Sequence, residues 1–387
     1  MIPAANLIGF AGQGLARKLP KVLGVLVETT LGSVVEIIVF MVLVRSGQIA
    51  VVRAAILGSI LANVLLCLGI CFIAGGFTRH EQVFHEAISE VGSGLLLVAG
   101  FGLIIPAAFA TIVGGASGSQ VDLHGVLRNA DIESRVLSIS RSTAILLLIA
   151  YFIYIYFQMS THHGIIDEVL EGDELLDTDR HKDMAKKKHT FIECIVALVI
   201  AIACVALIAV FLVLEIPYIV EERGVTEAFM GLILVPVVEK AAEHLSAIDE
   251  AWDNQANFAL THVLGASIQT ALLNTPLVVI VGWGLGQSMD LNFEQFQAIV
   301  LILAIIVVGN FLRDGKSNYL EGSLCVLTCK SLTTIIRKSC IVACYNNFNA
   351  YKDARRHDRR NGLLLSESGG PGGGGVDEWT RAHVCVG

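Results

Sequence analysis

The sequence predicts an all-α polytopic membrane protein built from two related helical halves in inverted orientation. Of its 387 residues, 54% are hydrophobic and only 16% are charged, and the mean hydropathy is +0.69. The apolar residues gather into runs of about 20, each long enough to cross a ~30 Å hydrocarbon layer as a helix. Two of these runs also repeat one pattern around an acidic residue, which predicts a duplicated unit.

Eight apolar segments follow one another along the chain, and each can span the membrane once tilt is allowed. They lie at 23–45, 51–74, 90–114, 141–159, 191–214, 225–249, 257–283 and 295–313. A ninth stretch, at 318–336, matches the pattern less well. Aromatic residues between Tyr151 and Phe157 suit the boundary between lipid and water, so we expect an interface near Gln158.

An acidic segment divides the chain, and we expect four parts. Residues 1–159 form an N-terminal transmembrane half, 160–190 an acidic, solvated linker of cytosolic type, 191–329 a C-terminal transmembrane half, and 330–387 an atypical, disordered tail. The glycine run in the tail lacks the Lys-Ser/Thr end of a phosphate loop. The net charge of −8 suggests no nucleic-acid partner. Nine cysteines show no zinc-type spacing, so we expect no cofactor.

The internal repeat is the strongest signal. A glutamine lies 12 residues after Glu36 and again 12 residues after Glu243, and a Leu-Gly pair ends 22 residues after each. Each copy is an apolar helix with an internal carboxylate, a short polar turn and a second helix. Five crossings separate the two copies, so they run in opposite directions, and inverted repeats of this kind meet near the bilayer midplane. We expect Gly32, Gly58 and Gly265 to allow close approach there.

The repeated glutamates are the candidate metal and proton ligands. A carboxylate in the middle of a span costs about 2.5–3.5 kcal/mol, so it persists only where it faces a cavity, a partner or an ion. Glu36 and Glu243 both occupy such positions. They could instead be protonated structural groups, but their recurrence at equal offsets favours a functional pair.

Two carboxylates surrounded by neutral oxygens suit a hard divalent cation such as calcium, which takes about 6–8 oxygen ligands. We expect the neutral oxygens to come from Ser59, Asn63, Ser267 and Gln269 on the partner helices. A buried carboxylate favours its neutral form until a cation stabilises the charged one. Cation and protons then compete for the same oxygens, and their mutual exclusion is antiport.

The chain carries the stretches VEIIV, SGQIAVVRAAILGSILANVLLCLG, AAEH, LGASIQTALLNTPLVVIVGWGLG and DGKSNYLEG. Together they resemble the vacuolar calcium/proton exchangers of the calcium/cation antiporter superfamily, over roughly Leu7 to Gly322. The resemblance implies the two inverted five-helix halves of that superfamily. It also implies that Glu36 and Glu243 are the paired metal and proton ligands.

The chain departs from the family pattern around both glutamates. Ser33 stands in place of the first asparagine of the Gly-Asn-Ala motif, and Glu239 and Lys240 replace the second Gly-Asn. Glu28 stands where an asparagine is expected, and at two further positions alanine replaces a common serine. Several neutral oxygen ligands are therefore expected to be missing.

Lys240 is the sharpest departure because it precedes Glu243 by three residues and so shares its helical face. We expect a salt bridge between them, although the lysine stem could instead reach a helix end and leave the site untouched. An ammonium in the cavity would repel a divalent ion, whereas Glu28 and Glu239 add carboxylates that offset it. His244 is expected to support the site by hydrogen bonding, and it could relay protons near neutral pH.

These observations predict a secondary active transporter, not an enzyme: a proton-coupled cation antiporter, with calcium the first candidate ion. The resemblance implies an integral protein of the vacuolar membrane. The expected partners are the cation, protons and the lipid bilayer, and no protein partner is identified. Two alternatives stay open, namely a monovalent cation/proton exchanger modified by Lys240, and a membrane regulator that retains the fold without transport.

Overall fold

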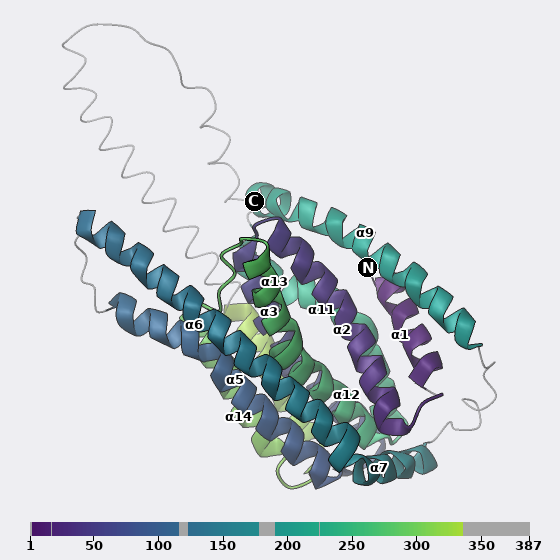
Figure 1. The fold of residues 1–387 in the computed structure, drawn as a ribbon. Helices are drawn as coiled ribbons and strands as arrows, with labels where there is room; N and C mark the ends of the chain where they lie inside the picture. The colour runs from purple at the N-terminus through teal and green to yellow at the C-terminus, as the bar shows by residue number, and fades with distance from the viewer. Residues whose placement is uncertain (1, 17, 116–122, 178–189, 224, 336–387) are drawn as a thin grey trace, which may run out of the picture.

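The computed structural model is a bundle of long helices, as the sequence predicts (Figure 1). It describes residues 2–16, 18–115, 123–177, 190–223 and 225–335. Six helices in this part are long and apolar enough to cross a membrane by length and composition. They cover Val22–Arg45, Ile49–Phe77, Glu86–Val113, Ile132–Thr161, Phe191–Val220 and Ala256–Gly284. The expectation of an all-α polytopic fold is confirmed.

The described residues of the first half supply eight helical segments and a two-residue strand up to the linker. They are α1 (Ile2–Ala16), α2 (Lys21–Arg45), α3 (Ile49–Leu61), η1 (Ala62–Cys67), α4 (Leu68–Thr78), β1 (Gln82–Val83), α5 (Glu86–Gly115), α6 (Leu123–Tyr156) and the short η2 (Phe157–Thr161). The helix α7 (His163–Leu176) follows within the acidic linker. The predicted second span is therefore one continuous helical rod made of α3, η1 and α4.

The second half repeats the plan. Its elements are α9 (Phe191–Arg223), α10 (Glu227–Phe229), η3 (Met230–Leu234), α11 (Val235–Trp252), α12 (Ala256–Gln269), η4 (Thr270–Asn274), α13 (Thr275–Gly284), α14 (Gln295–Phe311) and β2 (Lys316–Ser317). Residues 319–335 are helical as well, where the hydropathy pattern predicts a weaker ninth segment. The strands β1 and β2 pair antiparallel and join the two halves.

The sequence analysis did not anticipate two helices. The first is α1, only 15 residues long and so too short for a span of its own. The second is α7, whose acidic residues suggested a solvated segment, although Ile166, Leu170 and Asp173 are buried. The linker residues 178–189 lie outside the described residues. The predicted disordered tail, 330–387, is described only over 330–335, and these residues continue a helix instead.

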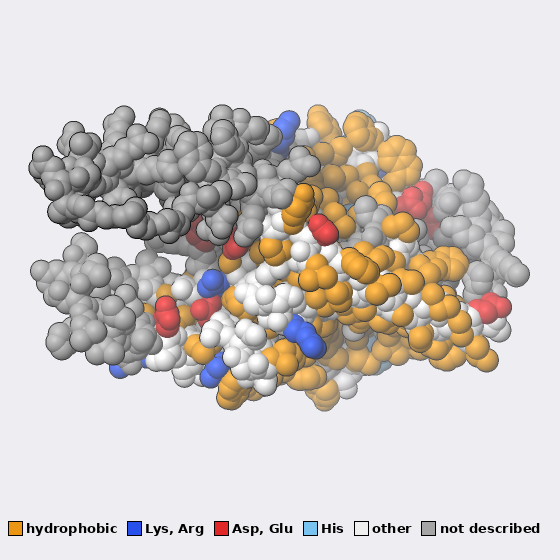
Figure 2. Space-filling model, turned by 90° about the horizontal axis from the view of Figure 1, so that it is seen from above, with side chains coloured by type: hydrophobic (Ala, Val, Ile, Leu, Met, Phe, Trp, Pro, Cys, Tyr) orange, Lys and Arg blue, Asp and Glu red, His pale blue; other side chains and the backbone are white. Residues whose placement is uncertain are grey.

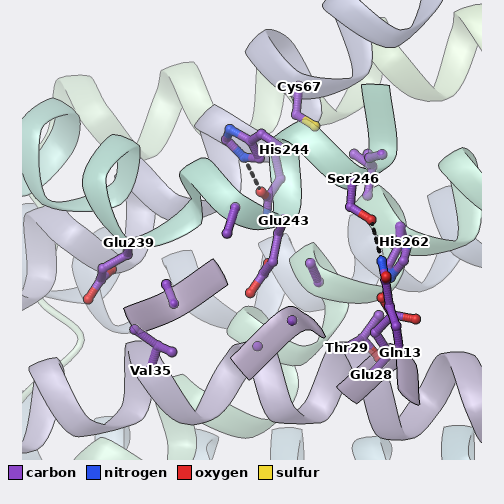
Figure 3. Close-up of a pocket in the computed structure, with 18 of the residues that line it drawn as sticks. Gln13, Glu28, Thr29, Val35, Cys67, Glu239, Glu243, His244, Ser246 and His262 are labelled. Atoms are coloured by element: carbon purple, nitrogen blue, oxygen red, sulfur yellow. Dashed lines mark hydrogen bonds and ion pairs between the residues drawn. The ribbon is translucent and has the colours of Figure 1, made fainter. Parts of the chain in front are cut away.

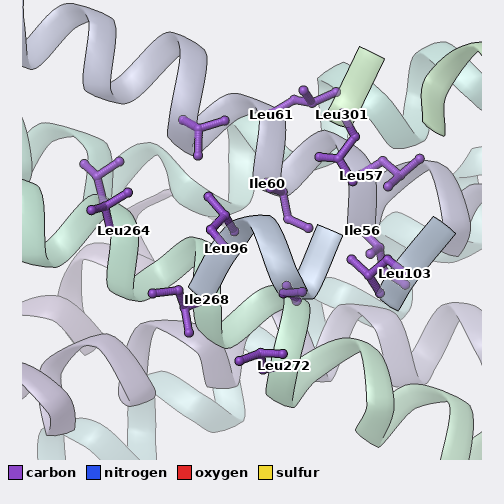
Figure 4. Close-up of a cluster of buried hydrophobic side chains, with 14 of the residues drawn as sticks. Ile56, Leu57, Ile60, Leu61, Leu96, Leu103, Leu264, Ile268, Leu272 and Leu301 are labelled. Atoms are coloured by element: carbon purple, nitrogen blue, oxygen red, sulfur yellow. The ribbon is translucent and has the colours of Figure 1, made fainter. Parts of the chain in front are cut away.

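The hydrophobic core lies between the inner helices of the two repeats. Of the most apolar 18-residue stretch within each helix, 83% is buried in Ile49–Phe77 and 78% in Ala256–Gly284. The corresponding share in Phe191–Val220 is only 17%. Figure 4 shows Ile56, Leu57 and Ile60 of α3 packed with leucines of α5, α12 and α14. The outer helices carry apolar side chains outward instead, and Figure 2 shows a surface dominated by them. Lipid, not water, suits such a surface.

Both repeats contain a π-helical turn at the same position. Superposing Glu36 on Glu243 places η1, Ala62–Cys67, on residues 269–274, and η4 spans Thr270–Asn274. A π-turn inserts one extra residue and rotates the side chains that follow it, and such turns are frequent at functional sites. The duplication inferred from the sequence therefore extends to the local backbone.

The linker helix α7 caps the N-termini of two site helices. The carboxylate of Asp167 accepts a hydrogen bond from the backbone N–H of Val22, in the first turn of α2 (2.8 Å). Asp173 accepts from the backbone N–H groups of Asn257 and Phe258 (2.7 and 3.1 Å) and from the Asn257 amide (2.8 Å), in the first turn of α12. Neither α2 nor α12 has a side-chain cap of its own. Figure 1 shows α7 lying across that end of the bundle.

Replacing Asp173 with alanine should lower the free energy of unfolding by about 1–3 kcal/mol, because two buried donors and one half-buried donor lose their acceptor. Thermal or denaturant unfolding of the detergent-solubilised protein measures the change. Glu171→Ala is the matched control, since Glu171 is an exposed carboxylate on the same helix, and it should stay within about 0.5 kcal/mol of the wild type. Equal stability of the two variants would show that α7 does not cap α12.

Candidate functional site

The two glutamate-bearing helices cross in opposite directions. A side chain added at Gly32 of α2 would overlap the carboxylate of Glu243 on α11. Four residues further along α2, Glu36 contacts Lys240, which lies three residues earlier on α11. Residue numbers thus rise along α2 as they fall along α11, which is the antiparallel crossing expected of inverted repeats. The missing side chain of Gly32 provides the room for Glu243.

One ammonium group joins the two repeated glutamates. Nζ of Lys240 lies 3.2 Å from Oε2 of Glu36 and 3.1 Å from Oε2 of Glu243. The side chains of Lys240 and Glu36 are 1% and 0% exposed, whereas that of Glu243 is 25% exposed. The predicted Lys240–Glu243 salt bridge is present, and the alternative in which the lysine stem reaches a helix end is wrong. Two carboxylates from opposite repeats therefore converge on a single cationic position.

The Glu36 carboxylate is also held by the π-turn of the second repeat. The hydroxyl of Thr270 and the amide of Asn274 each donate a hydrogen bond of 2.8 Å to Oε2 of Glu36. The other oxygen of Glu36, Oε1, is buried and accepts no hydrogen bond from the part of the chain that the structure describes. The same holds for the side-chain oxygen, Oδ1, of Asn274. Buried acceptors without donors call for a further partner, such as a proton, a water or a cation.

Glu243 faces a cavity of about 340 Å³ bounded by α1, α2, α11, α12 and η1. Figure 3 shows its carboxylate in the middle of this cavity, with Glu239 at one side and Glu28 at the other. Gln13 of α1 closes part of the wall, and its amide donates to the Ser246 hydroxyl (3.0 Å). The two repeated glutamates thus differ in environment, because Glu36 is enclosed by protein and Glu243 opens to a hollow.

Two further acidic residues line the same cavity. Glu239 is 3% exposed, and neither of its carboxylate oxygens has a hydrogen-bond partner among the described residues. Glu28 lies with Oε1 3.7 Å from Nε2 of His262, on α12. Glu239 is therefore the least compensated carboxylate of the site.

The neighbour of Glu243 links the two repeats. Nε2 of His244 lies 2.9 Å from the side-chain amide oxygen, Oδ1, of Asn63 in η1. That oxygen can only accept, which assigns the proton to Nε2 and leaves Nδ1 as the free nitrogen if the ring is neutral. His244 therefore makes the kind of supporting hydrogen bond that the sequence suggested.

The remaining predicted oxygen ligands lie close by but make other contacts. The side-chain oxygen of Gln269 accepts a hydrogen bond from the Ser33 hydroxyl, and the side-chain NH₂ group of Gln269 donates one to the Thr29 hydroxyl (2.8 Å each). The Ser267 hydroxyl donates to the Val263 carbonyl of its own helix. The buried Ser59 hydroxyl makes no hydrogen bond with the described residues. None of these three side chains has a hydrogen bond to Glu36 or Glu243 in the described part of the chain.

The sequence analysis missed Thr270 and Asn274, which do contact Glu36. The repeat contained the signal, because superposing the two glutamates places Asn63 on Thr270. Asn274 follows Thr270 by four residues and so shares its face. Extending the repeat into the second helix would have identified both.

The arrangement can hold a cation between oxygen atoms and exchange it for protons. The carboxyl groups of Glu36, Glu239 and Glu243 share with the Lys240 ammonium a region from which lipid and protein exclude most water. The total charge of that region is therefore tightly constrained. Among the described residues, no group of three or more His, Cys, Asp or Glu side chains is arranged to hold a metal ion. The carboxylates available to a cation here are those of Glu36, Glu243 and the nearby Glu239, and the cation must contend with Lys240.

Comparisons with known proteins show which family and fold the chain resembles. A family model described as "Sodium/calcium exchanger protein" matches residues 1–160 and 194–328. "Vacuolar cation/proton exchanger 5" of Arabidopsis thaliana is 35% identical over 331 residues, covering 84% of this chain and 71% of that protein. The "Ca(2+)/H(+) antiporter" of Aphanothece halophytica is 31% identical over 337 residues, covering 85% of each. The solved structure of native YfkE is 25% identical with a TM-score of 0.67, covering 86% of this chain and 88% of that one.

Replacing Thr270 with valine should lower the free energy of unfolding by about 1–3 kcal/mol, because a buried carboxylate loses a hydroxyl donor while the side-chain volume is kept. Unfolding in detergent measures this loss. Thr261→Val is the matched control on the same helix, since the Thr261 hydroxyl donates only to the Asn257 carbonyl of its own helix. A loss no larger than that of the control would contradict the contact with Glu36.

Proposed function

The chain belongs to the sodium/calcium exchanger protein family, and from this premise we propose that it is a proton-coupled cation antiporter with calcium as its first candidate substrate. The family consists of transporters, and two relatives carry names that specify cation/proton and Ca²⁺/H⁺ exchange. We extend that activity to this chain on the strength of its own buried acidic site. The proposed location is an intracellular membrane of vacuolar type, after the name of the Arabidopsis relative.

The convergence of Glu36 and Glu243 on one buried ammonium is the observation that carries the proposal. Both carboxylates lie within 3.2 Å of Lys240 Nζ although they come from opposite repeats. A buried position that holds one positive charge between two carboxylates has the electrostatics that a transported cation needs. Lys240 thus supports the existence of a cation position and at the same time competes for it.

Proton coupling follows from the cost of leaving carboxylates charged in a low-dielectric environment. Without a bound cation, a carboxylate that is buried away from water is stabilised by taking up a proton. A cation that enters the site stabilises the charged form and expels that proton. Since the site cannot cross between its two access states with uncompensated charge, each cation that moves in one direction is matched by protons that move in the other.

The charge around Lys240 decides which cation balances the site. Two ionised glutamates and one ammonium leave a single negative charge, which one monovalent cation neutralises. An ionised Glu239 adds a second negative charge, as a divalent cation requires. Glu239 lines the same cavity and lacks hydrogen-bond donors in the described part of the protein, which favours its participation. Calcium exchange therefore depends on Glu239, and monovalent exchange is the second candidate, favoured by the position of Lys240.

Glu36→Gln and Glu243→Gln should each abolish calcium uptake by proteoliposomes that carry an imposed pH gradient. Each change removes a charge that the cation needs and a proton that the cation displaces, while the volume of the side chain is kept. Uptake of radioactive calcium, together with an internal pH dye, measures both halves of the exchange.

Glu90→Gln is the control, because Glu90 is an exposed glutamate at the start of α5, and its uptake should match the wild type. Calcium uptake that survives both site substitutions would eliminate the mechanism. If a variant still binds calcium but no longer transports it, the substituted glutamate carries protons and is not needed to bind calcium.

Lys240→Asn should raise calcium uptake relative to uptake of sodium or potassium, because removal of the ammonium frees both carboxylates for a divalent ion. The ratio of the two uptakes in parallel vesicle preparations is the measured quantity. Glu239→Gln is the opposing change, and it should lower that ratio.

An unchanged ratio in both variants would mean that Lys240 and Glu239 do not select the ion. If neither the wild type nor Lys240→Asn moves any of these cations, the chain retains the fold without transport, as a regulatory membrane subunit would.

A further inference from the structure

We propose that Glu250, His262 and Glu28 form a proton relay that connects the linker-side end of the bundle with the cavity around Glu243. The proposal rests on the proton-coupled antiport argued above and assigns one of its proton paths. None of the three residues belongs to the central group of Glu36, Lys240 and Glu243.

The imidazole of His262 has a carboxylate at each of its two ring nitrogens. Nδ1 lies 2.9 and 3.0 Å from the two carboxylate oxygens of Glu250, at the end of α11. Nε2 lies 3.7 Å from Oε1 of Glu28, on α2. A histidine that only stabilises the packing needs one such partner, whereas a ring placed between two proton acceptors can receive a proton on one side and release it on the other.

The three groups lie in order from the outside of the cavity to its inside. Glu250 is in the last turn of α11, which ends at Trp252, and it does not line the cavity. His262 and Glu28 both line it, and Figure 3 shows them together at one end. The end in question is the one covered by α7, since Asp173 caps α12 only five residues before His262.

Glu28 is also well placed to pass a proton to Glu243. It precedes Gly32 by four residues and so lies on the same face of α2, about one helical turn of 5.4 Å away. The space at Gly32, which an added side chain would fill, is where the Glu243 carboxylate lies. No side chain of α2 therefore separates Glu28 from Glu243 on this face.

The transfer conserves protons at every step. Starting from a neutral ring with hydrogen on Nε2, Nδ1 accepts a proton from protonated Glu250, and Nε2 releases its proton to ionised Glu28 through one water that bridges the 3.7 Å gap. Glu250 is then ionised, Glu28 is protonated, and the ring carries its hydrogen on Nδ1. A cavity water that takes the Nδ1 proton while another proton is returned to Nε2 restores the starting tautomer, and solvent reprotonates Glu250.

Other titratable groups face His262 from the elements packed around it. Glu243 of α11 acts on its charge from further along the cavity, in addition to Glu250 and Glu28. The linker helix α7 presents Asp173 at the start of α12, and η1 contributes the thiol of Cys67 to the same cavity. Carboxylates on α2, α7 and α11 thus lie around this end of the bundle.

The test measures exchange by His262→Ala in proteoliposomes, with calcium as the probe cation and an internal pH dye. The rate of calcium-driven proton movement should fall by about tenfold or more, as for loss of a general acid–base group. Added imidazole should restore it, because a free imidazole can occupy the space that the substitution leaves. Calcium affinity of the solubilised protein at fixed pH should be unchanged. His80→Ala, at an exposed histidine near β1, is the control and should behave as the wild type with or without imidazole.

Glu250→Gln, which keeps the shape of the side chain but cannot pass a proton on as a carboxylate does, should slow proton movement without any response to imidazole. Wild-type rates in both variants would overturn the relay. A slow His262→Ala protein that imidazole does not restore would also overturn it, since the role of the ring would then be structural. If the wild type itself moves no protons in response to calcium, the proposed antiport fails and the relay fails with it.

Discussion

A carboxylate that is completely enclosed within a membrane bundle must be neutralised or solvated by the protein, and the site is organised around that requirement at Glu36. The carboxylate is 0% exposed, and in such surroundings an unpaired charge costs several kcal/mol. Lys240 supplies a positive charge, and Thr270 and Asn274 supply two hydrogen bonds. These three partners come from the second half of the chain, so the two halves must meet at this point for the Glu36 charge to be compensated.

The duplicated unit satisfies this requirement in two unequal ways. Each repeat contributes a glutamate and, in its second helix, a π-turn at the equivalent position. The π-turn of the second repeat binds Glu36 directly, whereas that of the first repeat presents Asn63 to His244, beside Glu243. Glu243 consequently keeps an open side toward the cavity. Because of this asymmetry, Glu36 holds the two repeats together, whereas Glu243 is accessible to ions and protons in the cavity.

The sequence predicted those features that depend on local pattern. Long apolar runs identify helices because lipid permits little else, and the i,i+3 spacing of Lys240 and Glu243 was sufficient to predict their contact. The contact between Lys240 and Glu36 depends on how α2 crosses α11, which no spacing within one helix reveals. The helix α7 was missed for a related reason, because the acidic residues that suggest solvent are the ones that cap α2 and α12. The π-turns leave no signature in composition, and only the repeat could have pointed to Thr270.

The coupling energy between Glu36 and Lys240 tests the central claim most directly. It is obtained from the free energies of unfolding of the wild type, Glu36→Gln, Lys240→Met and the double variant. The ion pair predicts that the double variant is more stable than the sum of the single changes implies, by about 0.5–3 kcal/mol, because removal of Lys240 leaves Glu36 buried without a counter-charge, and removal of Glu36 leaves Lys240 with Glu243 alone. Additivity to within about 0.3–0.5 kcal/mol would mean that the two side chains do not interact. In that case, the repeats do not share one cation position.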